Sequence, residues 1–199
     1  AAPGRRPVTA QNDSPAAFID ACVLAGALKR HLVLSLAEAG LIYPRWSQKV
    51  LFETGHAHAR IVSTEPGRDG AGEAARIVTA LEAAFPEATV PLEMSETVQL
   101  PARRLPDPDD AHVMRAAAAC GAAFILTENM KDFPRKILAP LGLYARPTAE
   151  LLGSELSRRP DETRAALMAA ADRLKLTPGR FMVALQRAQL GGVARRLGL

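Results

Sequence analysis

Acidic side chains follow predicted strands at two separate places, and their spacing predicts a site for a divalent cation. Asp20 directly follows the apolar run 16–19, and the polar loop 127–132 directly follows the apolar run 122–126. Parallel strands present their carboxyl ends at one edge of a sheet, so Asp20 and this loop are expected to meet. Clustered carboxylates without Lys or Arg repel one another unless a divalent ion neutralises them. Oxygen ligands favour Mg²⁺ or Mn²⁺ over Zn²⁺, and these ions suit the in-line hydrolysis of a phosphodiester.

Further acids are candidates for the same edge of the sheet. Ser47 can cap a helix that carries Glu53 about one and a half turns later, and Asp107-Pro108-Asp109-Asp110 is a strong helix start. Each acid taken singly also has a structural explanation, because aspartates cap helices, polar loop residues form turns and a helix surface tolerates a glutamate. Asp20 is harder to explain in this way, since burying an unpaired charge between apolar neighbours is costly.

Strand-like and helix-like segments alternate along the chain, which predicts a parallel sheet covered on both faces. Strands are expected at 16–19, 41–43, somewhere within 89–105, at 122–126 and around 143–145, with helices between them. From residue 148 the chain reads as helical, with breaks at Pro160 and Pro178. The expected fold is a three-layer α/β/α domain over 16–147 with a central parallel sheet of four or five strands. A disordered leader over 1–15 precedes it, and a helical extension over 148–199 packs on it.

Composition narrows the classes of protein that remain. The 199 residues are 48% hydrophobic, and 25 basic minus 21 acidic residues give a net charge of +4, which permits polyanionic partners without requiring them. Apolar stretches such as 116–126 are too short to cross a bilayer. Cys22 and Cys120 lack zinc-site spacing and are expected to be buried. The glycine-rich loops and nucleophile elbow of nucleotide-binding proteins and serine hydrolases are missing from the sequence.

Four motifs, in order, resemble the PIN-domain family, in particular the VapC-like ribonuclease toxins of bacterial toxin–antitoxin pairs. The first is residues 18–24, FIDACVL, where the family commonly has Asn at the position of Cys22. The second is Ser47 followed by Glu53, and the third is residues 105–113, LPDPDDAHV, in which Asp110 aligns with the metal-binding acid. The fourth is residues 126–134, LTENMKDFP, with Asn129 and Asp132 at the closing positions of the site.

The resemblance implies a Mg²⁺- or Mn²⁺-dependent endoribonuclease of the cytoplasm. Its catalytic residues would be Asp20, Glu53, Asp110 and Asp132. The ion would be held by Asp20, Glu53 and Asp110, with Asn129 and Asp132 contributing directly or through water and Thr127 supporting them. Candidates for binding the phosphates of RNA are Arg115, Lys131, Arg135 and Lys136.

The resemblance also implies partners and leaves alternatives open. An antitoxin protein would bind an apolar helical stripe, either within 24–36 or in the C-terminal extension, and the chain would form a homodimer or a toxin–antitoxin hetero-oligomer, with no membrane partner. Cys22 and Asn129 depart from the commonest family residues, so a catalytically weak or inactive module that binds RNA or protein is the main alternative. A magnesium-dependent phosphatase acting on small molecules is a third.

Overall fold

The central sheet of the protein has five parallel strands in the order β3-β2-β1-β4-β5. The structure is a computed structural model and describes residues 14–64, 67–100 and 105–199. The strands are β1 (Ala16–Ile19), β2 (Tyr43–Ser47), β3 (Thr89–Val90), β4 (Phe124–Leu126) and β5 (Ala145–Arg146). Since β1 pairs with both β2 and β4, the chain changes its direction of travel across the sheet at β1. Such a switch point is where sites form in open parallel sheets.

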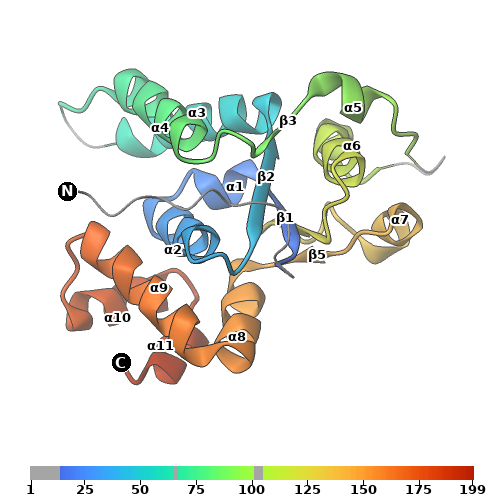
Figure 1. Ribbon diagram of the computed structural model, residues 1–199. Coiled ribbons are helices and arrows are strands. Elements are labelled where there is room, and N and C mark those ends of the chain that lie inside the picture. The colour runs from blue at the N-terminus through green and yellow to red at the C-terminus, as the bar shows by residue number, and fades with distance from the viewer. Residues whose placement is uncertain (1–13, 65–66, 101–104) are drawn as a thin grey trace, which may run out of the picture.

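Helices cover both faces of this sheet, as the sequence predicts for a three-layer α/β/α fold (Figure 1). The helices of the domain are α1 (Ala21–Leu24), α2 (Ala27–Glu38), α3 (Gln48–Val62), α4 (Gly70–Ala84), α5 (Leu92–Glu96), α6 (Ala111–Ala119) and α7 (Arg135–Leu138), with short 3-10 turns at Pro108–Asp110 and Ala139–Leu141. In Figure 1, α2 lies on one side of the strands and α6 on the other. Phe18, Ile125 and Val113 are fully buried between the layers.

The second strand differs from its expected position. The sequence predicts a strand at 41–43, whereas β2 spans Tyr43–Ser47 and contains Pro44. Proline usually argues against an inner strand because it lacks an N–H group. Here the N–H groups of β2 alternate between its two neighbours, and that of Trp46 donates to the Ala88 carbonyl at 3.0 Å. Because β3 pairs only with Trp46 and Ser47, no ladder hydrogen bond is required of Pro44.

The C-terminal part of the chain is helical and packs on α2. It consists of α8 (Thr148–Arg158), α9 (Pro160–Arg173), α10 (Pro178–Arg187) and α11 (Gly191–Leu197), which gather on the α2 side in Figure 1. The Glu155 carboxylate, only 1% exposed, pairs with Arg158 at 3.0 Å and with Arg159 at 2.7 Å. Arg159 also donates to the Leu41 carbonyl at 2.7 Å, so this buried ion pair attaches the extension to the start of β2.

The apolar helical stripes that were expected as antitoxin-binding surfaces have leucines that are buried in the core of the protein. Leu32 and Leu36 of α2, like Leu151 and Leu167 of the extension, are fully buried. Most of the predicted leader lies outside the described residues, but the Pro15 carbonyl accepts a hydrogen bond from the Tyr43 N–H at 2.9 Å. Within the described ranges, no helix combines the length and apolar character that crossing a bilayer requires.

Candidate metal centre

Asp20 lies where β1 ends and α1 begins, beside the end of β4. Its backbone N–H donates to the Leu126 carbonyl at 3.0 Å. Its carboxylate, 7% exposed as a residue, accepts a hydrogen bond from the Thr127 hydroxyl at 2.6 Å and another from the Cys22 thiol at 3.1 Å. The two strand ends therefore meet at one edge, and neighbouring donors offset the cost of burying the Asp20 charge.

The prediction that Cys22 is buried is wrong, because the residue is exposed. Its position in the first turn of α1 places it at the sheet edge rather than in the core. Although the residue as a whole is exposed, its sulfur faces Asp20 and Thr127. Desolvation of this sulfur, and next the Asp20 charge, raise the pKa of the Cys22 thiol to about 12, so the thiol stays protonated and remains a donor. Where the family commonly has an asparagine, this chain retains a hydrogen-bond donor to Asp20.

The loop after β4 brings Asp132 to the same edge of the sheet through hydrogen bonds between residues close in sequence. Thr127 is fully buried, and its hydroxyl accepts from the Asn129 N–H at 3.0 Å while donating to Asp20. The Asn129 carbonyl then accepts from the Asp132 N–H at 3.2 Å, which closes a turn. Asp132, 8% exposed, is thus fixed relative to Asp20 by the backbone and by a single hydroxyl.

Asp107, Asp110 and Asp132 form a cluster in which one carboxylate oxygen of each lies within 4.8 Å of the others. Asp107 caps the 3-10 turn by accepting from the Asp109 N–H at 2.9 Å. Residues three apart in a 3-10 turn lie one above the other, which places Asp107 and Asp110 on one side. In the sequence Asp107 is accounted for as a helix cap, and its three-residue interval to Asp110 is the signal that points to a ligand.

The electrostatics of this cluster match a cation site. Burial, then the charges of Asp20, Asp107 and Asp132, raise the pKa of Asp110 from 3.8 to about 6, against the opposite effect of His112. Asp20 therefore belongs to the same field of negative charge. The Asp110 Oδ2 atom is buried and has no hydrogen-bond partner among the described residues. Several carboxylates and an unpartnered buried oxygen are suited to a hard divalent ion.

Glu53 reaches this region from α3 but binds a histidine. Its Oε1 atom lies 3.0 Å from His112 Nε2 and 3.9 Å from Lys49 Nζ. His112 stands two residues after Asp110, in the first turn of α6, and its Nδ1 atom is buried without a partner in the described part of the chain. Glu53 therefore contacts His112, a residue with no expected role, and is not one of the three aspartates whose oxygens lie within 4.8 Å of one another.

Basic residues predicted to bind RNA lie on the surface of neighbouring elements. Lys131 has a side chain 83% exposed, with Nζ 3.8 Å from Asp132. Arg115 on α6, and Arg135 and Lys136 on α7, are also exposed. These positions fit electrostatic attraction of a polyanion and by themselves set no specificity.

Glu128 connects the loop to the rest of the protein. Its carboxylate lies 2.9 Å from Lys29 Nζ on α2 and accepts from the Thr148 N–H of α8 at 3.2 Å. Its own N–H donates to the Cys22 sulfur at 3.3 Å. The loop that carries Asp132 is thus tied to α1, α2 and α8.

An open parallel sheet with a cluster of aspartates near its carboxyl edge defines an α/β protein whose acidic residues could hold a metal ion. The model of the PIN domain matches residues 16–131, more than half of the chain, and the chain belongs to this family. PIN domains are generally metal-dependent nucleases and bind RNA, which the acidic cluster fits. No curated protein and no solved structure matches the chain significantly.

Proposed function

We propose that this PIN domain is an endoribonuclease that depends on Mg²⁺ or Mn²⁺. The observation that carries the proposal is the acidic cluster of Asp107, Asp110 and Asp132, with Asp20 close enough to raise the pKa of Asp110. These four residues would hold the ion, and Glu53 and Asn129 would lie around it. A bound divalent ion would stabilise the negative charge that develops on the scissile phosphate.

The chain's own residues would position the ligands and the substrate. Thr127 and Cys22 orient the Asp20 carboxylate by donating to its Oδ2 atom. His112 contacts Oε1 of Glu53, and Oε2 would accept the proton of the attacking water. Exposed cations such as Lys131 and Arg135 would attract the phosphates of a single-stranded or looped RNA.

Cleavage and metal binding can be measured on the same purified protein. Calorimetric titration with Mn²⁺ is expected to show uptake that Asp110→Asn and Asp132→Asn each abolish, together with loss of EDTA-sensitive cleavage of end-labelled RNA. Asp109→Asn is the matched control, because Asp109 is exposed in the same turn and lies outside the cluster. Unchanged cleavage in the Asp110 and Asp132 variants would refute the assignment.

The same measurements separate the alternatives. A module that only binds RNA or protein would show neither carboxylate-dependent Mn²⁺ uptake nor EDTA-sensitive cleavage. A small-molecule phosphatase would turn over a generic phosphomonoester and leave RNA intact.

We further propose that the protein is the toxin of a type II toxin–antitoxin pair, acting in the cytoplasm as a homodimer or in a hetero-oligomer with its antitoxin. The proposal is supported by membership of the PIN family and by the resemblance of the four motifs to VapC-like toxins. Expression of the wild-type chain is expected to arrest growth, and Asp110→Asn is expected to relieve the arrest. A short neighbouring gene for a DNA-binding protein, whose co-expression also relieves it, would identify the antitoxin.

A further inference from the structure

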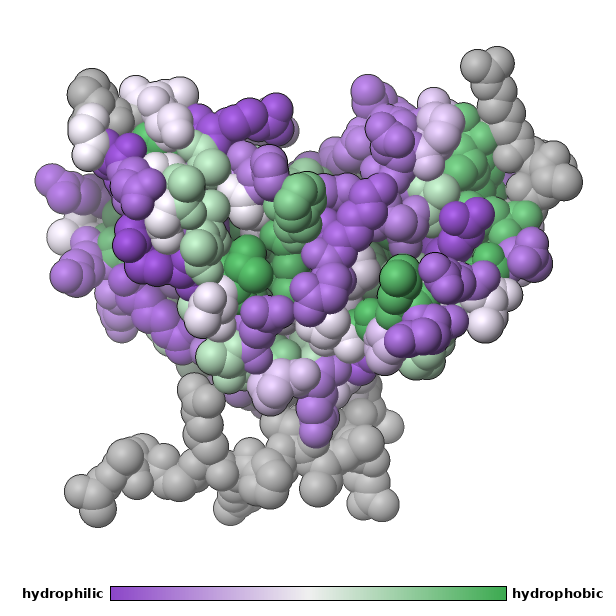
Figure 2. Space-filling view, turned by 90° about the horizontal axis from the view of Figure 1, so that it is seen from above, coloured by the Kyte–Doolittle hydropathy of each residue, from purple (hydrophilic) through white to green (hydrophobic). Residues whose placement is uncertain are grey.

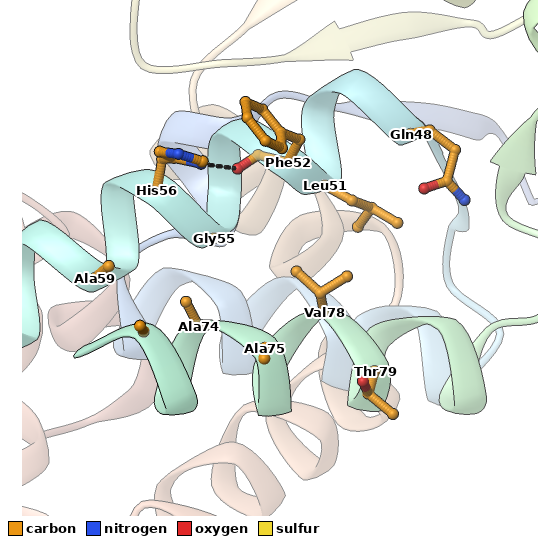
Figure 3. Close-up of a pocket in the computed structure, with 11 residues that line it drawn as sticks. Gln48, Leu51, Phe52, Gly55, His56, Ala59, Ala74, Ala75, Val78 and Thr79 are labelled. Atoms are coloured by element: carbon orange, nitrogen blue, oxygen red, sulfur yellow. Dashed lines mark hydrogen bonds between the residues drawn. The ribbon is translucent and has the colours of Figure 1, made fainter. Parts of the chain in front are cut away.

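A hollow of about 520 Å³ lies between α3 and α4, apart from the acidic cluster (Figure 3). Its floor is apolar, with Leu51 and Val78 facing each other from the two helices. The helices approach closely at Gly55, where an added Cβ would lie 3.6 Å from the Val78 side chain. Gln48 at the start of α3 and Thr79 of α4 also line the hollow, and the Gln48 amide donates to Glu82 Oε1 at 3.1 Å. The hollow is open to solvent, and its apolar lining with few polar groups suits the face of one flat ring.

An aromatic ring stands exposed at the rim of this hollow. Phe52 is 65% exposed, and its ring centroid lies 4.1 Å from that of His56 at an interplanar angle of 44°. The His56 ring is held by a contact of 3.1 Å between Nδ1 and the Phe52 carbonyl (Figure 3). The ring pair therefore has a fixed orientation and an open face. Flat exposed rings of this kind are the surfaces on which nucleic-acid bases stack.

The exposed face of α3 connects this ring to the metal centre. Neighbouring residues on a helix are rotated by about 100°, which follows from the repeat of roughly 3.6 residues per turn. Lys49 and His56 therefore lie between Glu53, which contacts His112 beside Asp110 in the chain, and Phe52, which borders the hollow. The Lys49 side chain is 54% exposed. The ammonium group of Lys49 thus lies between the acidic cluster and the Phe52 ring, where it could contact a phosphate of an RNA backbone that connects the two.

We propose that the hollow with Phe52 at its rim is a subsite for one nucleobase of a single-stranded RNA whose backbone runs over Lys49 to the acidic cluster. This inference rests on the proposed ribonuclease function and adds where the substrate binds beside the cleaved bond. Stacking on Phe52 would tolerate any base, because every base has a π face, and contacts to Gln48 and Thr79 would adjust the preference.

The surface around the hollow fits a base better than a protein partner. Among the described residues of α3 and α4, only Phe52 and Ile61 are large exposed hydrophobic residues. Figure 2 shows this face from above, with small apolar patches separated by hydrophilic residues. A stable protein interface buries on the order of 1,200 Å² or more around an apolar centre, whereas a base needs one ring and a shallow slot.

The test measures RNA binding in an Asp110→Asn background, in which the oligonucleotide stays intact. Fluorescence anisotropy would give the dissociation constants of single-stranded 12-mers of uridylate and of adenylate. Phe52→Ala and Phe52→Leu are expected to weaken binding about five- to 150-fold, the range for loss of one base–aromatic stack. Phe52→Trp should retain affinity, and its indole fluorescence should be quenched by bound RNA. Ile61→Ala, the matched control on α3, should change nothing.

Two results would overturn the inference while leaving the nuclease proposal intact. In the first, Phe52→Leu binds RNA as well as the parent, which means that the ring has no role. In the second, Phe52→Ala leaves RNA affinity unchanged and lowers the mass measured by light scattering, which identifies the hollow as a protein interface. If the parent binds no RNA and the wild-type chain cleaves none, the proposed function fails and the subsite with it.

Discussion

Replacing Asp110 by asparagine is expected to stabilise the ion-free protein while removing its affinity for the ion. In the folded state, burial and three neighbouring aspartates raise the pKa of Asp110 to about 6, compared with an ordinary value of 3.8. Folding therefore opposes ionisation of this carboxyl. A neutral amide of the same shape avoids the repulsion, so the variant should unfold at a higher urea concentration when EDTA is present.

The size and the pH dependence of this effect follow from the two pKa values. Their difference corresponds to about 3 kcal/mol at roughly 1.36 kcal/mol per pKa unit. Because Asp110 is only half-buried, solvent screening reduces the expected effect to about 1 to 1.5 kcal/mol. The folded state binds the proton more tightly, so the wild-type protein loses this stability as pH rises from 3.8 through about 6. The advantage of Asp110→Asn should be complete above about pH 7, roughly half as large at pH 5, about a fifth as large at pH 4, and absent near pH 3.

The stability difference can be measured by urea unfolding between pH 5 and pH 8. The proteins compared are the wild type, Asp110→Asn and the control Asp109→Asn. Adding Mn²⁺ should reverse the order, since ion at about 100 times its dissociation constant stabilises the wild type by about 2.7 kcal/mol. A variant less stable than the wild type in EDTA at pH 7.5, or a stability difference independent of pH, would show that the carboxylates do not repel one another as described.

Two further substitutions probe the groups around the cluster, and a third probes the attachment of the C-terminal extension. His112→Leu removes the donor that holds Glu53 at 3.0 Å, and calorimetry should show Mn²⁺ affinity falling about 10- to 100-fold, with partial recovery in the donor-retaining His112→Gln; equal affinities would leave His112 without a positioning role. Thr127→Val leaves the buried Asp20 carboxylate and the Asn129 N–H without their shared partner and should lower the free energy of unfolding by about 1 to 3 kcal/mol, whereas Thr127→Ser should be close to wild type. Glu155→Gln weakens the buried pair with Arg159 and should cost about 2 kcal/mol of stability in urea, less than for a fully buried pair because the arginine reaches water; an unchanged midpoint would contradict the attachment described for the extension.

Much of the fold follows from local sequence signals. Glycine just after a helical segment is a typical helix end, and Gly40 and Gly121 both adopt positive φ angles at such positions, +69° and +62°. Ser47 was expected to cap a helix, and its hydroxyl accepts from the Val50 N–H at 3.2 Å. The position of β2 could not be read in the same way, because the tolerance for Pro44 depends on how short the neighbouring strand is.

In the candidate site, too, some features could be predicted from local sequence and others depend on the tertiary structure. The meeting of Asp20 with Thr127 follows from the rule that parallel strands end at one edge, and it needed only the two apolar runs. The roles of Asp107 and His112 depend on the exact turn before α6 and on the distance across to α3. Both depend on the tertiary structure. From the sequence alone, Asp107 is interpreted as a helix cap and His112 as a surface histidine.

The three attachments of Glu128 have a consequence for how the chain can be shortened. A cut at the expected boundary between residues 147 and 148 would remove the Thr148 N–H that binds the Glu128 carboxylate, while the contact of that carboxylate with Lys29 would remain. The segment that bears Asp132 would lose a tether although no acidic residue had been touched. Truncated forms intended as a minimal nuclease should therefore keep at least the first turn of α8.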